Sequence, residues 1–231
     1  MASALPIDLA GTACLLDGRR ALYWHAAQTL VLADVHLGKG EAFRRQGVAI
    51  PSGHTQADCD AIAALLDDYR PQRLVVCGDL FHDRIRGDEG WLAALQALCH
   101  RHRQLTFDVV LGNHDRKSAA LPDLGMHWHA ELVLPPFVFH HEPQSDPRGY
   151  VLAGHLHPVV RLRGMGDALR LPVFWQRAEQ AVLPAFGSFT GGMAVEAGAG
   201  ERLYALSESS ITPLAAGTGA ALSKGASRCV F

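Results

Sequence analysis

The sequence has few of the features that mark secreted or membrane-spanning proteins. Its 231 residues include only five cysteines, an odd number, and no two of them have C-x-x-C spacing. No window holds the roughly 18 uninterrupted apolar residues of a membrane-spanning helix. The amino-terminal segment carries Asp8 and lacks the positive leader of a signal peptide. These absences predict reduced thiols, no membrane span and a cytoplasmic protein.

An excess of charge of either sign is also absent. The chain carries 21 lysines and arginines against 23 aspartates and glutamates, a formal net charge of −2. No global positive field therefore indicates a nucleic-acid binder, although a bound cation or a local basic cluster could supply attraction that the sum conceals. Histidine, in contrast, is abundant, with 13 residues. Because histidine is a common metal ligand and proton carrier, its positions decide what this abundance means.

Short apolar runs alternate with helical patterns in the first two thirds of the chain. Strands are expected at 29–34, 73–79, 106–113, 137–140 and 150–155, and amphipathic helices over 55–70 and 88–103. Thr55 and Asp58 resemble a capping box for the first helix. This alternation predicts an α/β domain.

The helical patterns stop after about residue 155. Strands are expected over 168–176 and 180–189, so a β-rich second half should pack on the first, and "GSFTGG" should form a turn near the site. The segment 207–231 is small, polar and poor in aromatics. We therefore expect a single domain over 1–206, followed by a loosely ordered tail over 207–231.

Potential metal ligands directly follow each of the five strand-like runs. The carboxyl ends of parallel strands lie at one edge of a sheet, which is where open α/β folds build their sites. Residues two apart on an extended segment project to the same side, so each D-x-H or H-x-H pair could hold one ion. The donors are Asp34-x-His36, Asp79 with His82 nearby, Asn113-His114-Asp115, His140-His141 and His155-x-His157.

This donor set is too large for one tetrahedral ion and lacks the cysteines of a structural zinc site. Mixed carboxylate and imidazole donors suit manganese, iron, zinc or magnesium. Two metal ions that share one carboxylate would use the whole set. Paired divalent ions are the usual device for the hydrolysis of phosphate esters.

The series D-x-H, G-D-x-x-H, G-N-H-D, H, G-H-x-H resembles the calcineurin-like metallophosphoesterases, and here it reads "ADVHLG", "GDLFH", "GNHD", "FHHEP" and "GHLHP". The stretches "DVHLGKGEAFRRQGVAIPSG", "AGHLHPVVRLRG" and "LPAFGSFTGG" further resemble bacterial metallophosphoesterases associated with a DNA ligase and a helicase in DNA repair. The resemblance implies a four-layer α-β-β-α sandwich with two mixed β-sheets. It also implies a manganese-dependent phosphodiesterase that acts on single-stranded DNA.

Carried over motif by motif, the resemblance also implies the ligand set. The first metal ion would be bound by Asp34, His36 and His157, the second by Asn113, His140 and His155, with Asp79 bridging them. His140 is favoured over its neighbour His141 because it immediately follows the strand, as the family ligand does.

The same resemblance implies that His114 donates a proton to the departing alkoxide or forms a hydrogen bond to the phosphate. Asp115 would orient the His114 imidazole and keep it protonated. His82 is expected to hydrogen-bond a ligand carboxylate rather than to coordinate metal.

Several basic residues are candidates for contact with the substrate. Arg84, Arg116 and Lys117 follow motif residues, and Lys39, Arg44 and Arg45 lie in a long segment beside Phe43. A cationic segment with an aromatic residue is typical of a channel for single-stranded nucleic acid. A solvated loop with one anchoring phenylalanine is the alternative interpretation.

Three functional hypotheses follow from the sequence. The first is a phosphodiesterase that acts as a single-strand DNA endonuclease. The second is a phosphomonoesterase for nucleotides or phosphoproteins on the same fold. The third is a metal-poor scaffold that binds protein partners; the intact donor set and the presence of His114 argue against it.

Overall fold

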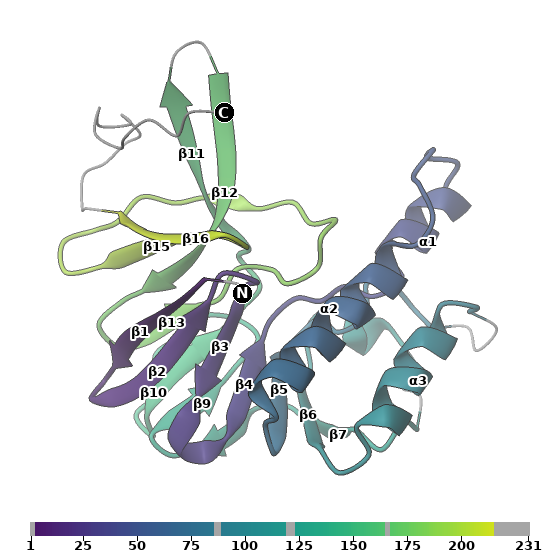
Figure 1. Ribbon diagram of the computed structural model, residues 1–231, viewed down its shortest axis with the longest axis horizontal. Coiled ribbons are helices and arrows are strands. Elements are labelled where there is room, and N and C mark those ends of the chain that lie inside the picture. The colour runs from purple at the N-terminus through teal and green to yellow at the C-terminus, as the bar shows by residue number, and fades with distance from the viewer. Residues whose placement is uncertain (1–2, 86–88, 119–122, 165–166, 215–231) are drawn as a thin grey trace.

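The computed structural model describes residues 3–85, 89–118, 123–164 and 167–214, with the side chains of 162–168 excepted. Within these ranges, two mixed β-sheets pack face to face, and helices cover the other face of the first sheet (Figure 1). None of the helices in this part of the chain has the length and apolar character needed to cross a membrane.

The first sheet combines an antiparallel half with a parallel half. Strands β1 to β4 are joined by short antiparallel connections, whereas β4 to β7 run parallel to one another. In the described residues its spatial order follows the chain: β1 (Ala4–Leu9), β2 (Thr12–Asp17), β3 (Ala21–Trp24), β4 (Thr29–Leu32), β5 (Arg73–Cys77), β6 (Thr106–Val110) and β7 (His127–His129).

The helices lie in the crossovers between the parallel strands. They are α1 (Lys39–Arg45), α2 (His54–Tyr69) and α3 (Leu92–Arg101), with short 3-10 turns at His25–Ala27 and Asp115–Lys117. Helix α2 ends at a left-handed Arg70 because Pro71 cannot continue it. Apolar residues of α2 and α3, such as Ile62 and Leu95, pack on the outer face of the sheet.

The second sheet is built almost entirely from the second half of the chain. Its parallel centre, β9–β10–β13, is flanked by antiparallel strands. The described strands are β8 (Leu132–Leu134), β9 (Phe137–Phe139), β10 (Tyr150–Ala153), β11 (Pro158–Gly164), β12 (Asp167–Gln176), β13 (Gln180–Val182), β14 (Met193–Ala194), β15 (Arg202–Ser207) and β16 (Ser210–Leu214).

An apolar core fills the space between the two sheets. It includes Phe137, Phe139 and Phe174 of the second sheet, which are fully buried against residues such as Val31 and Val75 of the first. Each fully buried side chain of this size contributes about 1.5–3 kcal/mol relative to exposure. This core fixes one sheet over the other and so sets the positions of the loops at their common edge.

The α/β sandwich with two mixed sheets is confirmed, but three finer expectations differ. Within the described ranges no α-helix follows Arg101, so a helical layer outside the second sheet is not found there. Strand β16 pairs with β15, which carries the ordered domain past residue 206; residues 215–231 of the expected tail lie outside the described chain. Gly53 caps α2, and Thr55 and Asp58 bond elsewhere, so the capping box is wrong.

Candidate metal centre

The carboxyl ends of β4, β5, β6, β9 and β10 meet at one edge of the sandwich, and backbone hydrogen bonds join the loops that leave them. The His36 amide donates to the carbonyl oxygen of Asp79 (2.9 Å), and the Gly154 amide donates to that of His141 (3.0 Å). The two sheets are also connected, because the Phe186 amide donates to the Ala33 carbonyl oxygen (2.8 Å). Loops from both sheets therefore form one continuous rim.

Left-handed backbone conformations concentrate in this rim. Such conformations are uncommon for residues other than glycine, and they cluster at functional sites. Because of these conformations, the D-x-H and H-x-H pairs converge through tight turns. The expectation that they converge through the alternation of side chains on an extended strand is wrong. The residues are Asp34 (φ 51°), His36 (53°), Asp79 (48°), His155 (69°) and His157 (46°).

Two glycines of the motifs permit the carboxylates to enter the rim. A Cβ atom on Gly112 would collide with the carboxylate of Asp79. A Cβ atom on Gly154 would collide with Oδ2 of Asp34. Only glycine tolerates such close approach, which explains why these motifs carry it directly before the donor residues.

A first group of donors comprises Asp34, His36 and His157. The Nε2 atoms of His36 and His157 lie 3.2 Å apart, and Nε2 of His157 lies 3.4 Å from Oδ1 of Asp34. All three donor atoms lie within 4.8 Å of one another. Oδ2 of Asp79 lies 3.9 Å from Nε2 of His36.

The second group surrounds Nε2 of His141. Oδ1 of Asn113 lies 2.9 Å from this nitrogen, Nδ1 of His155 lies 3.0 Å away, and Oδ2 of Asp79 lies 3.6 Å away. Nδ1 of His141 lies 3.3 Å from the carbonyl oxygen of Cys77, which accepts its proton and leaves Nε2 free to bind a metal ion. Oδ2 of Asp79 therefore stands between the two groups, as a bridging ligand would.

The structure corrects the choice of His140. This side chain turns away from the donors: Nε2 lies 3.0 Å from Asp146 Oδ2, and Nδ1 lies 2.9 Å from the Gln144 amide. His140 forms part of an ion network with Asp146 and Arg148. Successive residues project to opposite sides of an extended segment, so the side facing the site falls to the second histidine, His141.

The donor set suits divalent cations. Oδ1 of Asp34 and Nδ1 of His36 are buried and have no hydrogen-bond partner among the described residues. A buried carboxylate oxygen without a donor is costly, and a cation would compensate it. Burial, with the charge of Lys39 and neighbouring histidines, holds the pKa of His36 far below its usual range, which keeps the imidazole neutral and able to coordinate.

His114 lies at the opening of this centre. Its Nδ1 is engaged by the carbonyl oxygen of His82 and by Nζ of Lys117 at 3.0 Å. Nε2 is consequently the nitrogen that faces the centre, 3.9 Å from Oδ2 of Asp79. The His114 amide donates to Oδ1 of Asp79 (2.8 Å), which ties the backbone of the G-N-H-D turn to the bridging carboxylate. This position suits a proton donor.

The carboxylate of Asp115 does not contact the imidazole of His114, so the expected role of Asp115 in orienting that ring is wrong. Its fully buried carboxylate accepts hydrogen bonds from the amides of Phe81 (2.9 Å), Gly112 (3.0 Å) and Leu80 (3.3 Å). Burial raises its pKa to about 6 despite these bonds. Asp115 therefore joins the loops that carry Asp79 and Asn113, and the backbone of His82 orients His114.

His82 also differs from expectation. Burial, with Lys39 and His114 close by, lowers its pKa to about 4. Its ring stacks on that of His114, with centroids 4.8 Å apart, and meets the ring of His36 edge-on. Its Nδ1 has no partner within the described residues, so the expected bond to a ligand carboxylate is not formed there.

The basic candidates separate into two kinds. Lys39 lies close enough to the centre for the charges of Asp34 and Asp79 to act on it, although burial lowers its pKa overall. Arg116 is exposed. The others are engaged: Arg44 with Glu41 (2.9 Å), Arg45 with Glu89 (3.0 Å), and Arg84 with the carbonyl oxygen of Lys117 (3.2 Å).

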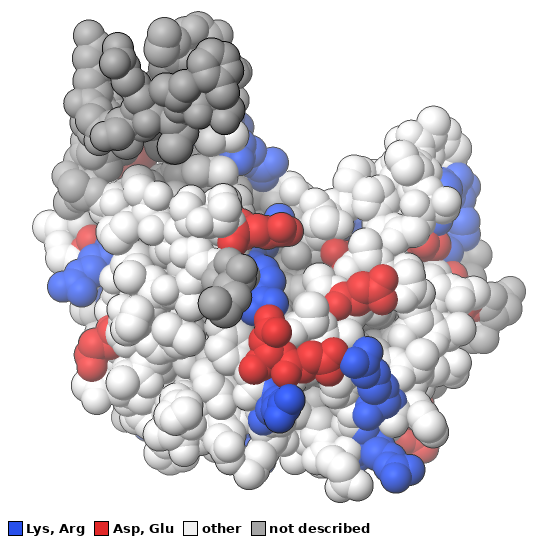
Figure 2. Space-filling view, in the orientation of Figure 1, with Lys and Arg blue, Asp and Glu red and all other residues white. Residues whose placement is uncertain are grey.

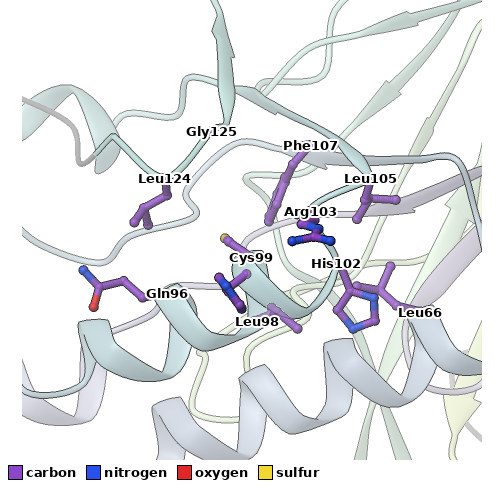
Figure 3. A pocket seen from close by; sticks show the side chains of 11 residues that line it. Leu66, Gln96, Leu98, Cys99, His102, Arg103, Leu105, Phe107, Leu124 and Gly125 are labelled. Atoms are coloured by element: carbon purple, nitrogen blue, oxygen red, sulfur yellow. The ribbon is translucent and has the colours of Figure 1, made fainter.

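A pocket of about 320 Å³ lies apart from the donor groups, beside the carboxyl end of α3 (Figure 3). It is lined by side chains such as Leu66, Cys99, His102 and Phe107. Among the described residues, none that lines this pocket belongs to a cluster of three side chains able to bind a metal ion. The catalytic chemistry therefore belongs to the rim and not to this pocket.

Comparisons with known proteins show what this chain is similar to. The model of the calcineurin-like phosphoesterase family matches residues 27–185. The crystal structure of the Pseudomonas putida nuclease MPE is 36% identical, covers 92% of this chain and 100% of its own, and has a TM-score of 0.81. The phosphoesterase Yfce of E. coli is 14% identical, covering 80% of this chain and 97% of its own with a TM-score of 0.39. No curated protein matches the chain.

A two-sheet sandwich with carboxylate and imidazole donors along one edge defines a metal-dependent phosphoric-ester hydrolase. The chain belongs to the calcineurin-like phosphoesterase family, whose members use divalent metal ions. Of the two adjacent histidines, the sequence favoured His140, whereas the structure places His141 beside the other donors. The sequence did not single out Phe189, whose ring contacts those of Phe43 and His54 near the rim. Phe189 lies in "GSFTGG", whose one aromatic among small residues was the available signal.

Proposed function

We propose that this hydrolase is a phosphodiesterase that cuts single-stranded DNA internally, with two manganese ions as cofactor. The observation that supports the proposal is the pair of donor groups on either side of Oδ2 of Asp79. The likeness to a nuclease at 36% identity over 92% of the chain supports a nucleic acid as the substrate. The first group is Asp34, His36 and His157, the second is Asn113, His141 and His155, and Asp79 lies between them.

The proposed mechanism assigns separate tasks to the residues of the rim. The divalent ions, when bound, neutralise charge on the phosphoryl oxygens and promote the ionisation of water. Asp79 holds the two groups in register, and Asp115 fixes the loops on which Asp79 and Asn113 sit. His114 directs Nε2 toward the opening, where it donates a proton to the leaving oxygen.

We also propose a setting for this activity. The resemblance to ligase- and helicase-associated enzymes supports a cytoplasmic role in bacterial DNA repair, in functional association with a DNA ligase and a helicase. Manganese is favoured among the possible ions by the same resemblance, and the mixed donor set also accommodates iron, zinc or magnesium.

A panel of DNA substrates incubated with manganese tests the proposal directly. We expect the enzyme to cut circular single-stranded DNA, which has no ends, and to cut it faster than duplex DNA. A chelator should abolish cutting, and added Mn²⁺ should restore it. If every DNA stays intact while a phosphomonoester is hydrolysed briskly, the activity is that of a phosphomonoesterase and the nuclease proposal fails.

Replacement of His114 tests its role as proton donor. We expect His114→Ala to bind manganese as the wild type does but to lose roughly 10²–10⁴-fold in turnover on an unactivated diester, because proton donation to a poor leaving group is lost. A diester with a nitrophenolate leaving group needs little protonation and should lose much less. An equal loss on both substrates would contradict the assignment, and calorimetry with Mn²⁺ would check that the metal site is intact.

A further inference from the structure

A series of aromatic rings extends from the metal centre along its rim. The ring of Phe43, on α1, stacks on His82 with centroids 5.9 Å apart and an interplanar angle of 19°. Phe189 meets Phe43 edge-to-face at 5.7 Å and stacks on His54 at 5.6 Å. The His82 ring also contacts the rings of His36 and His114, so the series runs from these rings through His82 and Phe43 to Phe189, the second ring beyond His82.

Phe189 is placed by a loop that is fixed to the donor residues. The Gly187 amide donates to the carbonyl oxygen of Asp34 (3.2 Å), and a Cβ atom on Gly187 would collide with the backbone of Val35. The Ser188 amide donates to Oδ1 of Asp58 on α2 (3.1 Å). The position of Phe189 is therefore determined by the same backbone that presents Asp34.

The phenylalanine at this position is not used to fill the core. Phe189 is 38% exposed, whereas Phe137, Phe139 and Phe174 are fully buried. An aromatic ring that is held from one side and open to solvent on the other offers a flat apolar surface. Aromatic side chains of this kind bind single strands because every base has a π-face to stack on.

Two of the arginines that were candidates for contact with a nucleic acid are engaged by carboxylates. Arg44 and Arg45 are paired with Glu41 and Glu89, and the chain as a whole carries −2. On the face shown in Figure 2, positive and negative side chains are interspersed and the described part forms no continuous basic surface. Contacts with the bases would therefore add to the attraction that the phosphates receive from bound metal ions.

We propose that Phe189 is a stacking platform for a nucleobase of the DNA strand beside the cleaved phosphate, with Phe43 and His54 supporting its ring. The inference rests on the proposed nuclease function and specifies how the site would recognise its substrate. Phe189 would bind any of the four bases without sequence preference, because every base has a face on which an aromatic ring can stack. It favours single strands, since the bases of a duplex are already stacked on their neighbours.

Three variants of Phe189 and two substrates test the platform. On a single-stranded oligonucleotide, Phe189→Ala and Phe189→Leu should raise KM about 5- to 20-fold and leave kcat within about twofold, whereas Phe189→Trp should keep the wild-type KM. On the same strand with abasic sugars, wild type and all variants should share one high KM. Val133→Ala, which changes a residue of β8 that is 36% exposed, is the matched control and should behave as wild type.

Leucine separates stacking from packing, because it retains apolar bulk in the loop without a π-face. A Phe189→Leu variant with wild-type KM on the normal strand would overturn the platform, as would an equal loss for Phe189→Leu on the normal and abasic strands. Thermal unfolding of each variant identifies any that fails to fold, in which case the leucine and tryptophan variants decide. If wild type cuts no DNA, the proposed function itself has failed, which is a distinguishable result.

Discussion

Asp79→Asn is expected to reduce phosphodiester hydrolysis by about 1,000-fold or more, because it removes the shared negative charge from both donor groups at once. Oδ2 of Asp79 lies 3.9 Å from Nε2 of His36 and 3.6 Å from Nε2 of His141. The asparagine retains Oδ1, which accepts the hydrogen bond of the His114 amide, so the turn that carries His114 should keep its shape. The loss should therefore come from metal binding and not from folding.

Calorimetric titration with Mn²⁺, together with hydrolysis at saturating metal, measures this effect. The wild type should bind two ions per chain, and Asp79→Asn should bind less than two at the same concentrations. Asp60→Asn removes an equal charge from an exposed position on α2 and should change neither quantity. Full stoichiometry with full activity in Asp79→Asn would show that the two groups do not form a shared centre.

His141→Ala and His140→Ala should have opposite outcomes although the residues are adjacent. We expect His141→Ala to lose at least about 100-fold in activity, because Nε2 of His141 is the atom around which Asn113 and His155 gather. His140→Ala should stay within several-fold of wild type. Its partner Asp146 keeps three hydrogen bonds from Arg148, one from the amide and two from the guanidinium, so the carboxylate is not left unpaired.

Activity measured across a manganese titration distinguishes the two histidines. The His141 variant should need much more metal and should not recover fully, whereas the His140 variant should saturate at the wild-type concentration. Thermal unfolding without metal provides the control for folding. The opposite ranking would restore the assignment made from the motif alone and would contradict the geometry.

The sequence predicted the strands and helices of the first half well because their patterns are local. Buried parallel strands such as β4 and β5 are short apolar runs, and α2 shows a helical period up to the proline that follows it. The sequence placed the end of the ordered domain at residue 206, whereas β16 follows that position in the structure. Its pairing with β15, which no local pattern reveals, is what orders it.

Side-chain roles were predicted less well than positions. Asp115 was expected to act on His114 because the two are adjacent, yet its carboxylate turns into the protein and bonds three backbone amides. Arg44 and Arg45 were candidates for contact with a substrate, with a solvated loop as the alternative, and in the structure Glu41 and Glu89 engage them. Asp58 was expected to cap its own helix and instead bonds Ser188, 130 residues away. Apart from the Arg44–Glu41 pair, which lies within one helix, each outcome depends on at least one partner distant in sequence.

The amino-acid order alone determined which donors are available and that they follow five strands, since these depend only on residue type and local apolar pattern. It therefore determined the family and the class of chemistry. The tertiary structure decided which atoms meet: left-handed turns aim Asp34, His36 and Asp79, and the packing of one sheet on the other brings His141 to Asn113. The physical reason is that a donor's direction depends on its backbone conformation and on loops from the other sheet, neither of which a linear motif contains.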